Sequence, residues 1–319
     1  MPKKQRKYAD DGWAIWVEGD DTSTVYINDW LNPKGKSYVD IGLRIRGIKS
    51  SKALYMYVPF TVDRDEIEDV SLCFDDTRIL QATFSATCIV DYKKNKHTTE
   101  IAYNGKTIDI VHLSTIDYQL QSLADGTLMS IDFEQLQPYI DNDEAYFIWR
   151  MPHRSLNEIF KPHVNMGNIL SRLRDLITTP VVSEKFGYSV RVNESRLLPE
   201  EITRMGAFHR QKMKKAVITI SIHEDYELND SGCYRIHRLE ENLYEGYLPK
   251  DYNCHDIITY QWQQNRAERL KGHFSFYYTL SKNYVSRGSM FLYMVLLIAV
   301  SVLGDLIANV VWSIKDMFN

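Results

Sequence analysis

The chain has 319 residues, of which 44% are hydrophobic and 25% are charged, and its formal net charge is −4. This acidic balance argues against nucleic-acid binding by the whole surface, so only local basic clusters remain as candidates for that contact. The length allows one large or two small globular domains.

The N-terminal sequence MPKKQRKYADDGW contains a basic cluster but lacks the apolar core of a secretory signal peptide. We therefore expect the body of the protein to remain in the cytosol. Thiols stay reduced in that compartment. Four scattered cysteines are accordingly expected to be free: Cys73, Cys88, Cys233 and Cys254.

Residues 1–150 predict a β-rich unit with mainly antiparallel strands. Aromatic and β-branched residues often alternate with polar ones in four segments, 38–47, 53–60, 78–92 and 127–133. Within residues 98–113, Asn104-Gly105 separates two alternating runs, as the turn of a type I′ hairpin does.

Residues 151–281 predict a helical joint followed by a second β-rich unit. Apolar residues recur at spacings of three and four between 155 and 178, which indicates two short helices broken near Pro162. A short helix is expected after Pro199. Strand patterns occupy 186–192, 215–222, 256–262 and 273–280. A single α+β domain is the alternative, because nothing near residue 150 resembles a flexible linker.

Residues 288–314 predict one transmembrane helix. A helix from Met290 to Ile314 rises about 37 Å, enough to cross a hydrocarbon core of roughly 30 Å with some tilt. Arg287 and Trp312 mark its ends, and the topology expected is a cytoplasmic body with a C-terminal, single-pass anchor. The fully apolar part ends at Val300 and is too short to cross alone, so a buried or interfacial helix is the alternative.

Polar residues in this segment are spaced four apart and therefore share one helical face, which we call the polar stripe: Ser301, Asp305, Asn309 and Ser313. Gly304 and Ala308 beside the stripe are small enough for another helix to approach. A carboxylate that faces lipid costs at least about 2.5 kcal/mol. We therefore expect Asp305 to face protein or water, unless its side chain snorkels to the membrane surface.

Two basic clusters suit phosphate, whether of a nucleotide, a nucleic acid or a lipid headgroup. Ordinary solvated surface is the alternative interpretation. Candidate phosphate-binding residues are Arg150, Arg154, Lys161, Arg204, Arg210, Lys212, Lys214 and Lys215.

Signatures of common enzymes are missing from the sequence, including the P-loop, the nucleophile elbow, HExxH and paired CxxC motifs. His223 and Glu224, at the end of a predicted strand, offer a general base. The nearest set of metal ligands is Cys233, His237, Cys254 and His255. Adjacent residues on an extended chain point to opposite faces, so no metal is expected there, and no cofactor is expected elsewhere.

These features favour a tail-anchored membrane effector or sensor. Its body is expected to bind a protein, nucleotide or nucleic-acid ligand, and its helix is expected to form homo-oligomers that perturb the membrane. The layout resembles that of small bacterial defence proteins, which makes antiviral defence one expected setting. A membrane-tethered scaffold and a membrane-bound hydrolase or nuclease are the alternatives.

Overall fold

The structure is a computed structural model, and it describes residues 10–19, 22–32, 35–84, 88–103, 105–153, 181–205, 213–228, 232–265, 273–285 and 287–317. The chain divides into two compact units. Unit 1 comprises Met1–Lys161, Gly187–Glu224 and Asp230–Tyr278. Unit 2 comprises Pro162–Phe186, Asp225–Asn229 and Thr279–Asn319.

A seven-stranded mixed sheet contains, in spatial order, β13 (Tyr226–Leu228), β16 (Phe274–Val285), β11 (Val181–Val192), β1 (Asp10–Glu18), β4 (Ala53–Val58), β9 (Gly126–Asp132) and β8 (Tyr118–Leu123). Strand β1 is parallel to β11 and antiparallel to β4. Strand β13 pairs with the part of β16 that belongs to unit 2.

A nine-stranded mixed sheet contains β14 (Arg235–Arg238), β15 (Ile257–Asn265), β12 (Met213–His223), β2 (Thr22–Trp30), β3 (Ser37–Arg46), β10 (Glu144–His153), β7 (Lys106–Val111), β6 (Thr98–Tyr103) and β5 (Cys88–Lys94). The β12–β2 and β10–β7 pairs are parallel. Strands from both sides of residue 150 occur in each sheet.

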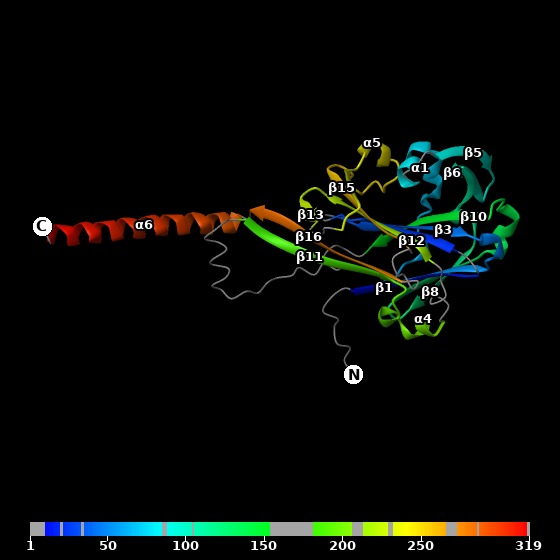
Figure 1. The fold of residues 1–319 in the computed structure, drawn as a ribbon, viewed down its shortest axis with the longest axis horizontal. Coiled ribbons are helices and arrows are strands. Elements are labelled where there is room, and N and C mark those ends of the chain that lie inside the picture. The colour runs from blue at the N-terminus through cyan, green and yellow to red at the C-terminus, as the bar shows by residue number, and fades with distance from the viewer. Residues whose placement is uncertain are drawn as a thin grey trace. The chain divides into compact units, whose positions relative to one another are not determined.

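The core of unit 1 lies between the two sheets (Figure 1). Trp13 of β1 meets His153 of β10 with ring centroids 6.4 Å apart, and Phe133, which follows β9, stacks on Phe147 of β10 at 5.7 Å. All four side chains are buried. Ring contacts between strands of different sheets therefore join the two layers.

Short helices cover the outer faces of the two sheets, on opposite sides of unit 1 (Figure 1). Ile202 of α4 (Glu200–Met205) packs with Ala14 and Trp16 on the seven-stranded sheet. Residues of α1 (Thr77–Phe84) and α5 (Glu241–Tyr244) pack on the nine-stranded sheet. The 3-10 helices are η1 (Ile48–Ser50), η2 (Arg64–Glu66), η3 (Val70–Asp75), η4 (Leu113–Thr115), η5 (Glu134–Tyr139) and η6 (Ser195–Leu197).

The β-rich α+β body predicted from the sequence is confirmed, including strands at β3, β4, β9, β12, β15 and β16. The predicted hairpin is β6–β7, in which Tyr103 pairs with Lys106. Gly105 has a φ of 72°, as a turn with left-handed residues requires. Asn104 and the predicted helices at 155–178 lie outside the described residues.

The strand predicted over 78–92 is wrong in its first half, where the chain forms helix α1 instead. Asp76 starts this helix: its carboxylate accepts a hydrogen bond from the Arg78 backbone N at 2.9 Å, and its carbonyl accepts one from Leu80 N at 3.1 Å. Ile79, Leu80 and Phe84 are buried on one side of the helix. Packing of this apolar face outweighs the β-branched composition of the segment.

Helix α6 (Arg287–Met317) belongs to unit 2 and contains 31 residues. Its apolar stretch, Met290–Ser313, has 24 residues, a mean hydropathy of 2.4 and no buried share. By length and composition this stretch is sufficient for a single membrane span.

Candidate functional site

A cavity of about 260 Å³ lies on the outer face of the nine-stranded sheet in unit 1. Strands β2, β12, β15 and β14 form its floor, while α1 and the segment around α5 form its roof. We call it the sheet-face cavity.

The floor of the sheet-face cavity consists of two rows of residues that cross four neighbouring strands. The first row is Asn28, Thr219, Gln261 and Arg235, and the second is Trp30, Ser221, Thr259 and His237. Adjacent strands are about 4.8 Å apart, so each row spans roughly 14 Å. Register alone therefore brings together side chains that are far apart in the sequence, such as Asn28 and Gln261 at 233 positions (261 − 28).

Two polar side chains in this floor, Ser221 and Thr259, are covered rather than left in water. The opposite face of β12 carries Ile218, Ile220 and Ile222, all buried in the core between the sheets. Such alternation is usual for a sheet with one solvated face. Ser221 and Thr259, however, are only 1% and 4% exposed, and their hydroxyl oxygens are 3.0 Å apart. The roof thus encloses hydroxyl groups on the face where water is the usual neighbour.

Aromatic rings border one end of the cavity. Trp30 lies 5.7 Å from Tyr244 and 6.0 Å from Tyr247, measured between ring centroids. The two tyrosines are 5.8 Å apart and almost perpendicular. Rings from β2 and from the α5 segment therefore form one cluster beside the polar floor.

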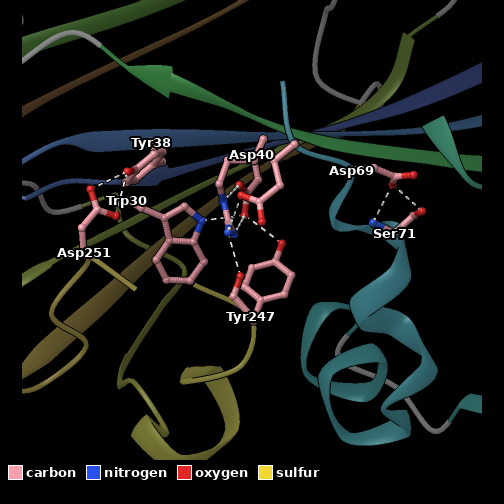
Figure 2. A network of polar contacts seen from close by, with 9 residues as sticks. Trp30, Tyr38, Asp40, Asp69, Ser71, Tyr247 and Asp251 are labelled. Atoms are coloured by element: carbon pink, nitrogen blue, oxygen red, sulfur yellow. Dashed lines mark hydrogen bonds and ion pairs between the residues drawn. The ribbon is translucent and has the colours of Figure 1, made fainter. Parts of the chain in front are cut away.

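A buried ion pair holds two of these rings in place (Figure 2). Asp40 accepts hydrogen bonds from Trp30 Nε1 at 2.6 Å and Tyr247 Oη at 2.7 Å, and from Arg150 Nε at 2.6 Å and Nη2 at 2.9 Å. Arg150 Nη1 also donates to the Tyr247 carbonyl at 2.7 Å. Burial and the Asp40 carboxylate raise the pKa of Tyr247 well above its usual value, so the phenol remains a neutral donor.

Besides the tyrosines, three ionisable side chains line the cavity: Arg235, His237 and Glu240. Burial, and then the charge of Arg235, lower the pKa of His237, which keeps its imidazole neutral at pH 7. Its Nδ1 atom is buried and has no hydrogen-bond partner among the described residues. Arg235 is exposed on the edge strand β14.

The predicted phosphate-binding residues that the structure describes do not form one cluster. Arg150 is buried in the Asp40 ion pair, on the α1 and α5 side of the core, whereas Arg204 lies on α4 at the opposite side and bonds Glu200 at 2.6 Å. Lys214 is exposed and Lys215 is half-buried on β12. Arg154, Lys161, Arg210 and Lys212 lie outside the described residues. Phosphate binding by this set stays a prediction, and the position of Arg150 favours a structural role.

The residues predicted as candidates for metal binding or catalysis make local contacts in the structure. His255 Nδ1 lies 2.7 Å from Glu241 Oε2. The described part of the chain contains no group of three or more His, Cys, Asp or Glu side chains arranged to hold a metal ion. His223 ends β12, and Glu224 donates its backbone N–H to the Asp256 carbonyl at 2.8 Å. No contact seen there tests the hydrolase alternative.

The polar stripe of α6 is exposed along its whole length within unit 2. Ser301, Asp305, Asn309 and Ser313 all fall within the apolar stretch. Beside them, a Cβ added to Gly304 has no atom within 4 Å.

Most residues of the sheet-face cavity were not identified from the sequence. The sequence suggests His237 only as a metal ligand, and it gives no signal for Arg235, Thr219 or Gln261. Alternation along β12 and β15 marks one polar face, but this signal does not tell a covered face from a solvated one.

No protein-family model matches the sequence, and no curated protein matches it significantly.

Proposed function

We propose that this chain is a single-pass membrane protein whose cytoplasmic body binds a ligand and whose C-terminal helix self-associates to perturb the membrane. The observation that carries the proposal is the apolar stretch Met290–Ser313, which has a mean hydropathy of 2.4 and no buried share. Lipid is the natural environment for so long an exposed apolar surface, because monomeric soluble proteins rarely leave one in water.

Flanking charges support the orientation of the proposal. Lys282 and Arg287 precede the apolar stretch on the side of the body, and basic residues near a span favour the cytoplasmic side. Trp312, near the other end, is 65% exposed and suits the interface between lipid and water.

Ligand binding by the body is supported by the sheet-face cavity of about 260 Å³. Its hydroxyl and amide groups, its aromatic rings and its Arg235 side chain are the kinds of group that orient a bound molecule. Self-association is supported by the polar stripe, since polar side chains in a membrane are stabilised when they face another helix.

Alkaline extraction of membranes from expressing cells tests the span. Full-length protein should stay in the pellet after carbonate treatment, and a variant that ends at Ser286 should move to the supernatant. Recovery of the full-length chain in the supernatant overturns the proposal.

Protease protection tests the orientation. The body should be cleaved only after the plasma membrane is permeabilised, because the proposal places it inside the cell. Cleavage in intact cells contradicts the cytoplasmic location while leaving the span itself intact.

A further inference from the structure

The floor of the sheet-face cavity offers neutral hydrogen-bonding groups in a fixed array. Thr219 lies between Asn28 and Gln261 in register on three adjacent strands. Amide groups present donors and acceptors together, and a hydroxyl can do either. Such an array matches a ligand with several donors and acceptors at the edge of a rigid framework.

The aromatic end of the cavity favours a flat ligand. Trp30 and Tyr247 are each only 4% exposed and are held by the buried Asp40, so they form a fixed backing for the half-buried ring of Tyr244. Tyr244 completes this border from the roof. Preorganised rings lower the entropy lost on binding and favour planar partners.

Ionic groups at the cavity favour a ligand with one anionic end. Arg235 has no ion-pair partner among the described residues, and its guanidinium suits a phosphate or carboxylate. His237 follows two positions later on the same face and presents a buried Nδ1 atom without a hydrogen bond in the described part of the chain. Glu240 lines the roof, and its carboxylate is able to accept hydrogen bonds from the amino or sugar hydroxyl groups of a ligand.

The size of the cavity limits the ligand to one small molecule. At about 260 Å³ it is slightly smaller than the roughly 300–1,000 Å³ typical of drug-sized ligands. It is therefore suited to a single nucleotide and not to a nucleic-acid strand.

We infer that the sheet-face cavity binds a nucleoside monophosphate, with the base beside Tyr244 and the phosphate at Arg235. The inference rests on the proposed function, in which the body is the ligand-binding part, and it specifies the class of that ligand.

Isothermal titration calorimetry on the full-length protein in detergent micelles tests the inference with AMP, GMP, CMP and UMP as probes. At least one of them should bind saturably. Arg235→Gln should weaken that binding at least about tenfold, because a charge-assisted hydrogen bond is lost. Thr219→Val should also weaken it, by removing a hydroxyl from the floor without changing the shape of the side chain.

Arg238→Gln is the matched control. Arg238 lies on the same strand, but its side chain pairs with Asp256 and does not line the cavity. This variant should bind like the wild type. The matching nucleoside should bind more weakly and show no dependence on Arg235, since it lacks the phosphate.

Three results overturn the inference: no nucleotide binds, Arg235→Gln and Arg238→Gln behave alike, or the nucleoside binds as tightly as its nucleotide. Carbonate extraction of the membranes from which the protein is purified separates these failures from a failure of the proposed function. Loss of nucleotide binding with an intact span removes the ligand class alone.

Discussion

At the scale of single residues, Asp40 connects the interior of the body to the sheet-face cavity. Four hydrogen bonds converge on its carboxylate, two from Arg150 and one each from Trp30 and Tyr247. A buried ion pair adds little net stability compared with an apolar replacement, but removal of one partner leaves an uncompensated charge. Substitution of Asp40 is therefore expected to destabilise the body more than substitution of an exposed carboxylate.

Asp40→Asn should lower the free energy of unfolding by about 3–5 kcal/mol, because it leaves the Arg150 charge buried without its partner. Urea denaturation followed by tryptophan fluorescence measures the change. Asp251→Asn is the control: Asp251 is exposed and accepts a bond from Tyr38 at 2.9 Å, so its loss should cost no more than about 1 kcal/mol. Equal effects of the two variants contradict the role assigned to the buried pair.

Two histidines should titrate on opposite sides of their ordinary pKa. Burial and Arg235 lower the pKa of His237, whereas the Glu241 carboxylate raises the pKa of His255. Exchange of the imidazole C2 proton, followed by mass spectrometry across pH, reports each value separately. His237 should have the lower pKa, and the reverse order contradicts the burial described for β14.

The lowered pKa of His237 sets the sign of its effect on the pH dependence of stability. The folded-state pKa of His237 is depressed, so its contribution is present above the unfolded value of about 6.5 and is lost as pH falls through the folded value. His237→Gln should therefore reduce the loss of stability on acidification below pH 6.5. Urea titrations at several pH values measure this. If the free energy of unfolding of the variant depends on pH as steeply as that of the wild type, His237 does not make this contribution.

The sequence predicts only part of the candidate site. The basic residues were found by their density along the chain, yet Arg150 proved to be buried against Asp40, a partner 110 positions away. The floor of the sheet-face cavity depends on strand order, which places β12 between β2 and β15. Local patterns carry no information about that order, so Thr219 and Arg235 could not be connected before the structure was known.

At the scale of elements, β3, β4, β9, β12, β15, β16 and the β6–β7 hairpin agree with the sequence prediction, whereas β2 and β8 alternate as well but were not predicted. Strand β10 was missed because it is buried on both faces and reads as a nearly continuous apolar run interrupted by Arg150 and Pro152. Helix α1 falls in a segment whose sequence predicts a strand, because eight residues are too few to distinguish the helical period from the strand period. In both cases the deciding factor is burial against distant elements.

The β6–β7 hairpin depends on a left-handed glycine. Gly105 has a φ of 72° and no atom within 4 Å of an added Cβ, so substitution affects conformation alone. Gly105→Ala should lower the free energy of unfolding by roughly 1–2 kcal/mol. Gly246→Ala is the matched control, since Gly246 also has open space but no left-handed φ. In thermal unfolding, Gly105→Ala should lower the midpoint temperature, and Gly246→Ala should leave it unchanged.

At the scale of the whole molecule, the contrast lies between a polar-surfaced body and an exposed apolar helix. In unit 1, the outer faces of both sheets are covered by short helices, and the large apolar side chains are mostly buried. In unit 2, the apolar side chains of α6 are exposed along the span, as for Ile298 and Ile307 at 62% and 63%. A second environment, lipid, is the simplest reason for two such different surfaces in one chain.

Helix α6 is expected to self-associate through its polar stripe. Interhelical hydrogen bonds in membranes contribute only about 0.6 kcal/mol each, so replacement of two stripe residues should weaken association by about five- to tenfold. We expect this loss for the double variant Asp305→Leu and Asn309→Leu, measured by energy transfer between labelled copies in liposomes. Ile307→Leu with Val311→Leu is the control, with the same spacing on the opposite face of the helix.

Leakage of a dye from the same liposomes tests whether association has an effect on the membrane. Wild-type protein and the Ile307 and Val311 control should release the dye to the same extent, and the stripe variant should release less at equal protein density. Energy transfer at the level of random encounters in the wild type contradicts self-association, because Asp305 is then satisfied by snorkelling to the membrane surface. Association without leakage makes the helix a tether, since contact between spans alone then has no effect on permeability.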